Sequence, residues 1–131
     1  MVVDTSALVA ILLAEPEAPR LVRAIGKAQQ RVIGAPTLVE AAAVMTARKG
    51  GGGEIALDAL LRRLGVGVVD MTEDVARLAR LVYARFGKGV GSPPVLNYGD
   101  CRAYGVAMAR GEPLPFKGDD FARTDVTVAP W

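Results

Sequence analysis

The chain begins with the stretch Met1-Val2-Val3-Asp4-Thr5-Ser6-Ala7-Leu8-Val9-Ala10, which indicates the class of fold. Its two β-branched valines predict a short buried strand that ends at Asp4. We expect a helix over Ser6–Leu13 directly afterwards, because a hydroxyl side chain is available to cap its first turn. A strand followed at once by a helix is the repeating unit of α/β folds.

The rest of the chain continues this alternation of short β-branched runs with helical periodicity. Further strands are expected at Arg31–Gly34, Val66–Val69, Leu114–Phe116 and Val126–Val128. Further helices are expected around Leu21–Ile25 and over Thr37–Arg48, Glu54–Leu64, Thr72–Phe86 and Asn97–Arg110. The glycine run Gly50–Gly53 predicts a flexible joint, and the Gly- and Pro-rich stretch Gly87–Leu96 predicts a loop. Together these segments predict an α/β fold with a mainly parallel sheet.

Length and composition are typical of one globular domain over residues 1–131, since 51% of the residues are hydrophobic and 23% are charged. No apolar run approaches the ~20 residues that span a bilayer. No basic segment precedes the first apolar stretch, so we expect no signal peptide. A single cysteine, Cys101, cannot form an internal disulfide, which fits a cytoplasmic protein. We expect Cys101 to be a small buried apolar residue.

The chain contains no histidine, and this absence limits its chemistry. It excludes Ser-His-Asp triads, Cys-His dyads, two-histidine ribonuclease mechanisms and zinc sites with histidine ligands. Any catalysis must use carboxylates, hydroxyls, lysine, arginine, tyrosine, one thiol or a metal ion held by oxygen atoms.

Most of the 14 acidic residues have positions typical of a solvated surface. These include acids on outward helix faces and acids in turns beside prolines, namely Glu54, Asp58, Glu73, Glu15, Glu17 and Glu112. Charged residues are rarely buried unless they are paired, so these six need no functional explanation.

Five other acids stand beside apolar positions. Glu40 and Asp100 each share a helix face with small apolar residues, where a carboxylate loses hydration. Asp4 ends the first strand, and the adjacent pair Asp119-Asp120 follows the short strand that ends at Phe116. Because functional sites of open parallel sheets form at the carboxyl ends of strands, we expect these acids to meet at one edge.

Each of these acids also has a purely structural interpretation. Asp4 can cap the first helix, and Asp100 can stabilise the start of its own helix beside Asn97. Glu40 can be one partner of a buried salt bridge. The pair Asp119-Asp120 is also ordinary turn chemistry.

If the acids do meet, their negative charges repel, and a divalent cation would relieve the repulsion. Oxygen ligands alone favour Mg²⁺ or Mn²⁺ over zinc or copper. The chain has 16 Lys and Arg residues against 14 Asp and Glu residues. Apart from the five candidate site acids its surface is therefore basic, which suits a polyanionic substrate.

Several segments carry a family resemblance. They are Val3–Ala10, Leu96-Asn97-Tyr98-Gly99-Asp100-Cys101, and Phe116-Lys117-Gly118-Asp119-Asp120-Phe121 with Thr124-Asp125 after it. With Glu40 on its alanine-rich helix, they resemble the PIN-domain ribonuclease toxins of the VapC family, in order and over essentially the whole chain. The resemblance implies a three-layer α/β/α sandwich with a parallel sheet of four or five strands. It also implies endonucleolytic cleavage of RNA, tRNA or ribosomal RNA, dependent on Mg²⁺ or Mn²⁺.

The resemblance also assigns roles by position. Asp4 and Asp100 match the principal metal ligands, and Glu40 matches the third acid. The fourth acid is Asp119 or Asp120, of which Asp120 is favoured because it directly precedes Phe121. Ser6 and Asn97 match polar residues close to the metal.

Implied partners are a VapB antitoxin whose C-terminal segment occupies the active-site groove, a second copy in a homodimer, and operator DNA in larger assemblies. The alternative is a catalytically weak binding module of the same fold, which acts through antitoxin pairing and operator regulation. A phosphate-accepting receiver domain is disfavoured because the opening acid pair of those domains is missing.

Overall fold

Parallel pairing of two short strands forms the centre of the computed structural model, which describes all 131 residues. Strand β1 (Val32–Gly34) pairs with β2 (Gly67–Val69) in the register Val32↔Gly67. On the other side of β1, Val2 forms a parallel bridge to Val32, and the backbone N–H of Val3 donates to the Val32 carbonyl at 2.8 Å. The opening segment therefore lies in the middle of the sheet, as its valines predict.

The last two expected strands contribute only single bridges. Leu114 pairs with Val128, and the N–H of Val2 donates to the Pro113 carbonyl at 2.9 Å, which continues the sheet on this side. Regular strands are thus fewer than the four or five expected, although the segments lie in the expected places. Prolines flank Leu114 on both sides and cannot donate a ladder hydrogen bond, which accounts for the shortness of this pairing.

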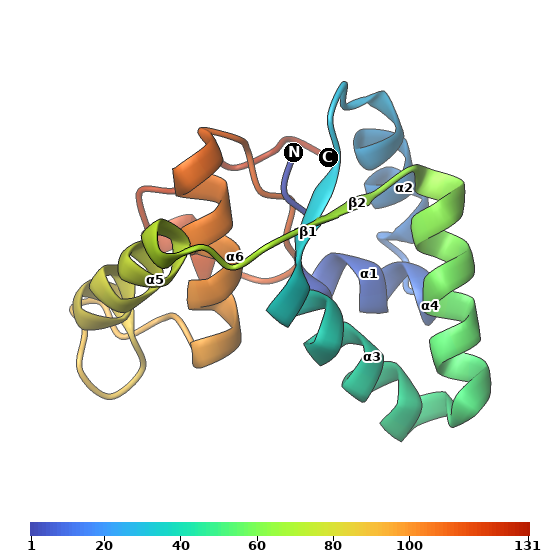
Figure 1. Ribbon diagram of the computed structural model, residues 1–131, viewed down its shortest axis with the longest axis horizontal. Coiled ribbons are helices and arrows are strands. Elements are labelled where there is room, and N and C mark those ends of the chain that lie inside the picture. The colour runs from blue at the N-terminus through green and yellow to red at the C-terminus, as the bar shows by residue number, and fades with distance from the viewer.

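Helices cover both faces of the strands (Figure 1). On one side lie α1 (Thr5–Leu12), α2 (Ala18–Lys27), α3 (Ala35–Lys49) and α4 (Gly51–Leu64). On the other side lie α5 (Glu73–Phe86) and α6 (Tyr98–Arg110), and a short 3₁₀ helix, η1 (Phe121–Arg123), follows. Every expected helix is present, with ends that shift by a few residues.

Two hydrophobic cores, one on each face, hold the three layers together. Val3 and Ile33 belong to the core under α1–α4, whereas Val2 and Val32 belong to the core under α5 and α6. This division follows from the pleat, since successive strand residues point to opposite faces. It confirms the predicted α/β/α arrangement. Cys101 is a free thiol buried in the second core, also as expected.

The glycine run is not a flexible joint. Helix α4 begins at Gly51, so three of the four glycines are helical. Gly53 is buried against α3, and a Cβ atom at this position would overlap the backbone carbonyl of Met45. The run therefore permits a tight turn between α3 and α4, a role that the prediction of flexibility missed.

Three of the acids in turns form ion pairs that the sequence analysis did not predict. The Glu112 carboxylate pairs with the N-terminal ammonium and with Arg110, and it is mostly buried. Glu15 and Glu17 both pair with Lys117. By contrast, Glu54, Asp58 and Glu73 are exposed on helices, as expected. None of the helices combines the length and hydrophobicity that a membrane crossing requires.

The α3–α4 turn yields a test with an internal control. We expect Gly53→Ala to lower the free energy of unfolding by about 1–3 kcal/mol, the usual cost of overpacking. Gly52→Ala places its methyl group in open space and should raise stability by roughly 0.5 kcal/mol by restricting the unfolded chain. Urea denaturation measures both changes, and equal effects of the two variants would contradict the close approach at Gly53.

Candidate active site

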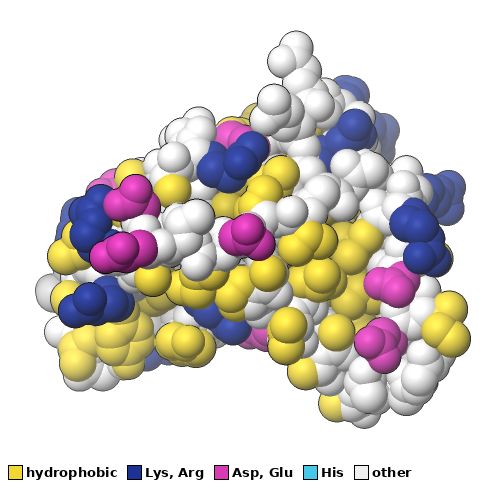
Figure 2. Space-filling model, viewed as in Figure 1, with side chains coloured by type: hydrophobic (Ala, Val, Ile, Leu, Met, Phe, Trp, Pro, Cys, Tyr) yellow, Lys and Arg dark blue, Asp and Glu magenta, His cyan; other side chains and the backbone are white.

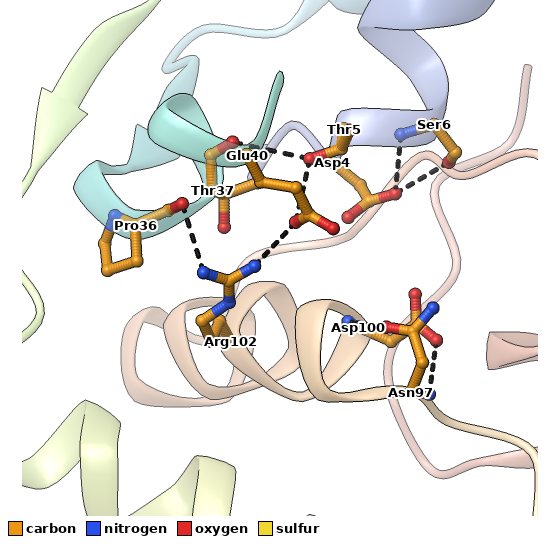
Figure 3. A network of polar contacts seen from close by, with 9 residues as sticks. All are labelled: Asp4, Thr5, Ser6, Pro36, Thr37, Glu40, Asn97, Asp100 and Arg102. Atoms are coloured by element: carbon orange, nitrogen blue, oxygen red, sulfur yellow. Dashed lines mark hydrogen bonds and ion pairs between the residues drawn. The ribbon is translucent and has the colours of Figure 1, made fainter. Parts of the chain in front are cut away.

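Asp4 is the most buried acid of the chain, with 4% of its surface exposed. It caps the N-terminus of α1, where its Oδ2 atom accepts hydrogen bonds from the backbone N–H of Ser6 at 2.9 Å and from the Ser6 hydroxyl at 2.7 Å (Figure 3). Burial raises the pKa of Asp4, although the Ser6 hydrogen bonds oppose the rise. The structural interpretation of Asp4 as a helix cap thus holds, and its carboxylate is also held desolvated in one orientation.

Ser6 connects Asp4 to a segment that is distant in sequence. Its hydroxyl oxygen accepts a hydrogen bond from the backbone N–H of Lys117 at 3.1 Å. The turn that carries Asp119 and Asp120 begins at this residue. Ser6 therefore fixes the position of this turn relative to Asp4.

Asp100 lies in the first turn of α6, opposite Asp4 (Figure 3). It forms a reciprocal capping box with Asn97: the backbone N–H of Asn97 donates to the Asp100 carboxylate at 2.7 Å, and the N–H of Asp100 donates to the Asn97 side chain at 2.9 Å. Burial, together with the negative charges of Asp4 and Asp120, raises the pKa of Asp100 to about 6. Three segments thus bring negative charge to one place.

Of the two adjacent acids in the final turn, Asp120 is the one whose charge acts on Asp100. Its carboxylate is about half exposed and lies 3.2 Å from the ammonium of Lys88. Asp119 is exposed and forms no ion pair. The charge of Asp120, the candidate that the family resemblance favours, thus contributes to the raised pKa of Asp100, and Asp119 is not among the causes.

Glu40, on α3, faces the same edge but is engaged elsewhere. Its carboxylate accepts from the guanidinium of Arg102 at 2.8 Å and from the Thr5 hydroxyl at 3.2 Å (Figure 3). It also lies against the backbone of Gly99, where a Cβ atom would be 2.5 Å from Glu40 Oε1. The salt-bridge interpretation of Glu40 is thus realised, and a side chain at position 99 would push this carboxylate aside.

Sequence analysis missed two cations of this site, Arg102 and Lys88. Arg102 also donates to the Pro36 carbonyl at 3.3 Å, so it joins α6 to the start of α3. Its position four residues after Tyr98 places both side chains on one helix face, and this spacing was the available signal. Lys88 lies in the loop before α6, where nothing in the sequence links it to Asp120.

As they stand, no three acidic or thiol side chains are close enough together to hold a metal ion. Arg102 holds Glu40, and Asn97 holds Asp100. The kind of donor nevertheless fits Mg²⁺ or Mn²⁺, because every candidate ligand is a carboxylate oxygen. The buried charge of Asp4 and the raised pKa of Asp100 mark the position where a cation would be most favourable.

Comparison with known proteins extends this assignment. Residues 1–126 match the model of the PIN domain family. The chain is 45% identical over 130 residues to ribonuclease VapC30 of Mycobacterium tuberculosis, and the match covers 98% of each protein. This chain belongs to the VapC family of PIN-domain ribonucleases.

Solved structures of VapC proteins share the fold of this family member. VapC20 of Mycobacterium tuberculosis, a toxin that cleaves the sarcin-ricin loop, is 21% identical and superposes with a TM-score of 0.72 over 98% of each chain. The toxin–antitoxin complex VapBC2 of Rickettsia felis, bound to a DNA fragment from its promoter, is 15% identical and gives a TM-score of 0.74 over 97% of this chain and 94% of the other. PIN-domain ribonucleases are generally dependent on divalent metal ions, in agreement with the carboxylate site.

The raised pKa of Asp100 predicts how stability depends on pH in this VapC protein. Above pH 6 the folded chain holds an ionised, crowded carboxylate, whereas an unfolded Asp titrates near 3.9. Asp100→Asn keeps a capping oxygen without the charge. In EDTA at about pH 8 it should therefore raise the free energy of unfolding by about 1–2 kcal/mol, after a discount for partial exposure.

This advantage must disappear as the pH falls through 6 toward 4, because wild-type Asp100 then becomes protonated in the folded state. Urea titrations at several pH values measure it. Asp58→Asn, on the exposed face of α4, removes the same charge and should leave stability nearly unchanged. A variant Asp100→Asn that is less stable than wild type at about pH 8 would show that the carboxylate is not under repulsion.

Proposed function

We propose that this VapC-family chain is the toxin of a type II toxin–antitoxin system, an endoribonuclease that uses Mg²⁺ or Mn²⁺ to cleave tRNA or ribosomal RNA in the cytoplasm. The observation that carries the proposal is the convergence of Asp4, Asp100 and Asp120 from three separate segments. A purely structural surface gains nothing from carboxylates that raise one another's pKa.

Asp4 and Asp100 are the proposed principal ligands, with Asp120 and Glu40 as further acids of the site. When bound, a divalent cation supplies a Lewis acid that activates water and neutralises charge on the scissile phosphate. The protein orients the ligands: Ser6 fixes the carboxylate of Asp4, and Asn97 fixes that of Asp100. Because the chain has no histidine, we expect hydrolysis to leave 5′-phosphate and 3′-hydroxyl ends rather than to proceed through attack by a 2′-hydroxyl.

Positive charge lies close to these acids. Lys88 and Arg102 both reach carboxylates of the site, and the chain carries 16 basic residues in all. Such cations are suited to contacts with the phosphates that flank the scissile bond. We propose that RNA is recognised by its shape and its unpaired bases, as is usual for proteins that act on RNA.

The proposed partner is a VapB-type antitoxin, whose C-terminal segment occupies the active-site groove. The shared fold with the Rickettsia felis complex supports this partner, since the toxin in that structure is bound to its antitoxin and to promoter DNA. We extend the proposal to a homodimer and to an assembly with antitoxin on operator DNA.

One observation favours the alternative of a catalytically weak binding module. The ion pair between Glu40 and Arg102 removes one acid from the site, and no three acids form a metal-binding group in this structure. A protein with this arrangement can still pair with an antitoxin without cleaving RNA.

Cleavage assays with antitoxin-free protein distinguish the two functions. Total tRNA and ribosomal RNA should be cut at discrete positions in Mg²⁺ or Mn²⁺. EDTA should abolish the cuts, and Asp100→Asn should reduce the rate by at least about a hundredfold, as expected when metal-assisted chemistry is removed. Asp58→Asn is the matched control and should keep wild-type activity, because its exposed carboxylate lies on α4.

A thermal shift with Mn²⁺ is the companion measurement. The ion should stabilise wild-type protein and not Asp100→Asn, because ligand binding to the folded state raises its stability. Stabilisation by Mn²⁺ without cleavage of either RNA would favour the binding module. Cleavage that persists in EDTA and in Asp100→Asn would reject the carboxylate mechanism.

A further inference from the structure

A pocket of about 560 Å³ lies between α5 and α6, outside the cluster of acids. Six of its eight lining residues are hydrophobic, among them Met71, Ala79 and Cys101. The other three of these six are Ala76, Tyr83 and Tyr98. Figure 2 shows hydrophobic side chains gathered on the part of the molecule where α5 lies in Figure 1. The volume falls within the range of small-molecule sites.

The remaining lining residues are two cations, Arg80 and Arg102, and no acid lines the pocket. Arg80 takes part in none of the ion pairs of the structure. The guanidinium of Arg102 lies over the ring of Tyr98, 4.9 Å from its centroid. An aromatic face beside Arg80, which has no ion pair, and Arg102, which shares its charge with Glu40, matches the chemistry of a nucleotide, whose base stacks and whose phosphate is anionic.

Helix α6 is a common wall of this pocket and of the acid site. Tyr98 and Arg102 are separated by one helical turn and face the pocket, whereas Asp100 between them belongs to the acid cluster. Arg102 contacts both sides, because it stacks on Tyr98 and pairs with Glu40. A nucleotide chain that crosses this wall can place a base in the pocket and a phosphate at the carboxylates.

Tyr98 is unusually exposed for an aromatic residue at the start of a helix, with 72% of its surface accessible. Beside an apolar pocket, such a ring leaves a flat apolar face that another molecule can cover. An unpaired base is a suitable cover, since it brings an apolar face and leaves its phosphate in solvent.

We propose that this pocket binds one unpaired nucleobase of the RNA substrate, stacked on Tyr98, with Arg80 and Arg102 contacting the adjoining phosphates. The inference deepens the proposed function, on which it rests, by naming the subsite that selects the base next to the cleaved bond. Base selection here is by stacking and shape, so it favours some bases without excluding the others.

The main test compares Tyr98→Ala and Tyr98→Trp on short single-stranded RNAs with randomised bases around the cleavage site. Tyr98→Ala should raise KM by about tenfold, the order expected for the loss of one base–aromatic stack, and should flatten the base preference at one position. Tyr98→Trp should keep the KM and the base preference of wild type, because indole also stacks. A fall in kcat that is equal for all RNAs, with the base preference intact, would instead mean that Tyr98 only positions Arg102 and Glu40, and would overturn the proposal.

Arg80 can be compared with Arg77, an arginine on the same helix, α5. Arg80→Ala should raise KM for RNA several-fold, because Arg80 lines the pocket. Arg77→Ala removes the same charge from α5 but outside the pocket, where Arg77 pairs with Asp74. It should therefore have a smaller effect. Equal effects of the two substitutions would indicate general attraction by positive charge and would contradict a defined subsite.

Binding without cleavage separates this inference from the proposed function. In the double variant Tyr98→Trp, Asp100→Asn, addition of a randomised pool of single-stranded RNA should quench the new indole fluorescence. The Asp100→Asn protein reports the background from Trp131, which lies beside Arg20 on α2. Quenching in a protein whose wild type cuts no RNA would support the pocket and reject the nuclease. Cleavage by wild type without any quenching would support the nuclease and reject the pocket.

A second copy of this chain is the competing occupant of the pocket. Sedimentation of wild type and Tyr98→Ala decides the matter, in the absence of RNA. A dimer that dissociates in Tyr98→Ala, with base preference unchanged, would make this face an interface between copies and overturn the proposal. The same oligomeric state in both proteins supports the RNA subsite.

Discussion

The negative charges of Asp4 and Asp100 repel one another at one edge of the sheet, and much of the surrounding structure serves to hold them there. Burial raises the pKa of both groups, and Asp120 adds a third charge. The helix caps offset part of this repulsion, because each carboxylate accepts backbone N–H groups at the positive end of a helix. The same hydrogen bonds that stabilise α1 and α6 therefore fix the orientation of the charges that a cation would meet.

Arg102 offsets the negative charge of Glu40, as the backbone N–H groups at the helix ends do for Asp4 and Asp100. Its guanidinium neutralises the carboxylate, contacts the Pro36 carbonyl and stacks on Tyr98. A single side chain thus joins α3, α6 and the pocket between α5 and α6. A ligand that displaced Tyr98 would remove one of the contacts that hold Arg102 beside Glu40. The acid cluster and the pocket are physically coupled through this residue.

The layers of the fold were predictable from local patterns, since two valines before Asp4 define a strand with two buried faces and short β-branched runs alternate with helical periodicity. Much of the strand pairing was not predictable, because single bridges at Leu114 and Val128 leave no periodic signal. At the candidate site, small residues around Glu40 and Asp100 and the strand end at Asp4 singled out these acids as candidates. The ion pairs of Glu40 and Asp120 could not be predicted, because Arg102 and Lys88 reach them only through tertiary packing. The glycine run shows the same limit: composition indicated flexibility, whereas close contact with Met45 requires Gly53 in a helix.

The pairing of charges also bears on how many cations the site can take. Lys88 neutralises Asp120, and Arg102 neutralises Glu40, so Asp4 and Asp100 are the two acids without an ion pair among these four. Asp4 and Asp100 would hold one divalent ion, whose charge would balance theirs while both ion pairs stayed in place. A second ion would have to displace Lys88 or Arg102, and the freed cation would then need another anion. The phosphate of a bound RNA is such an anion, so occupancy beyond one ion should follow substrate binding rather than precede it.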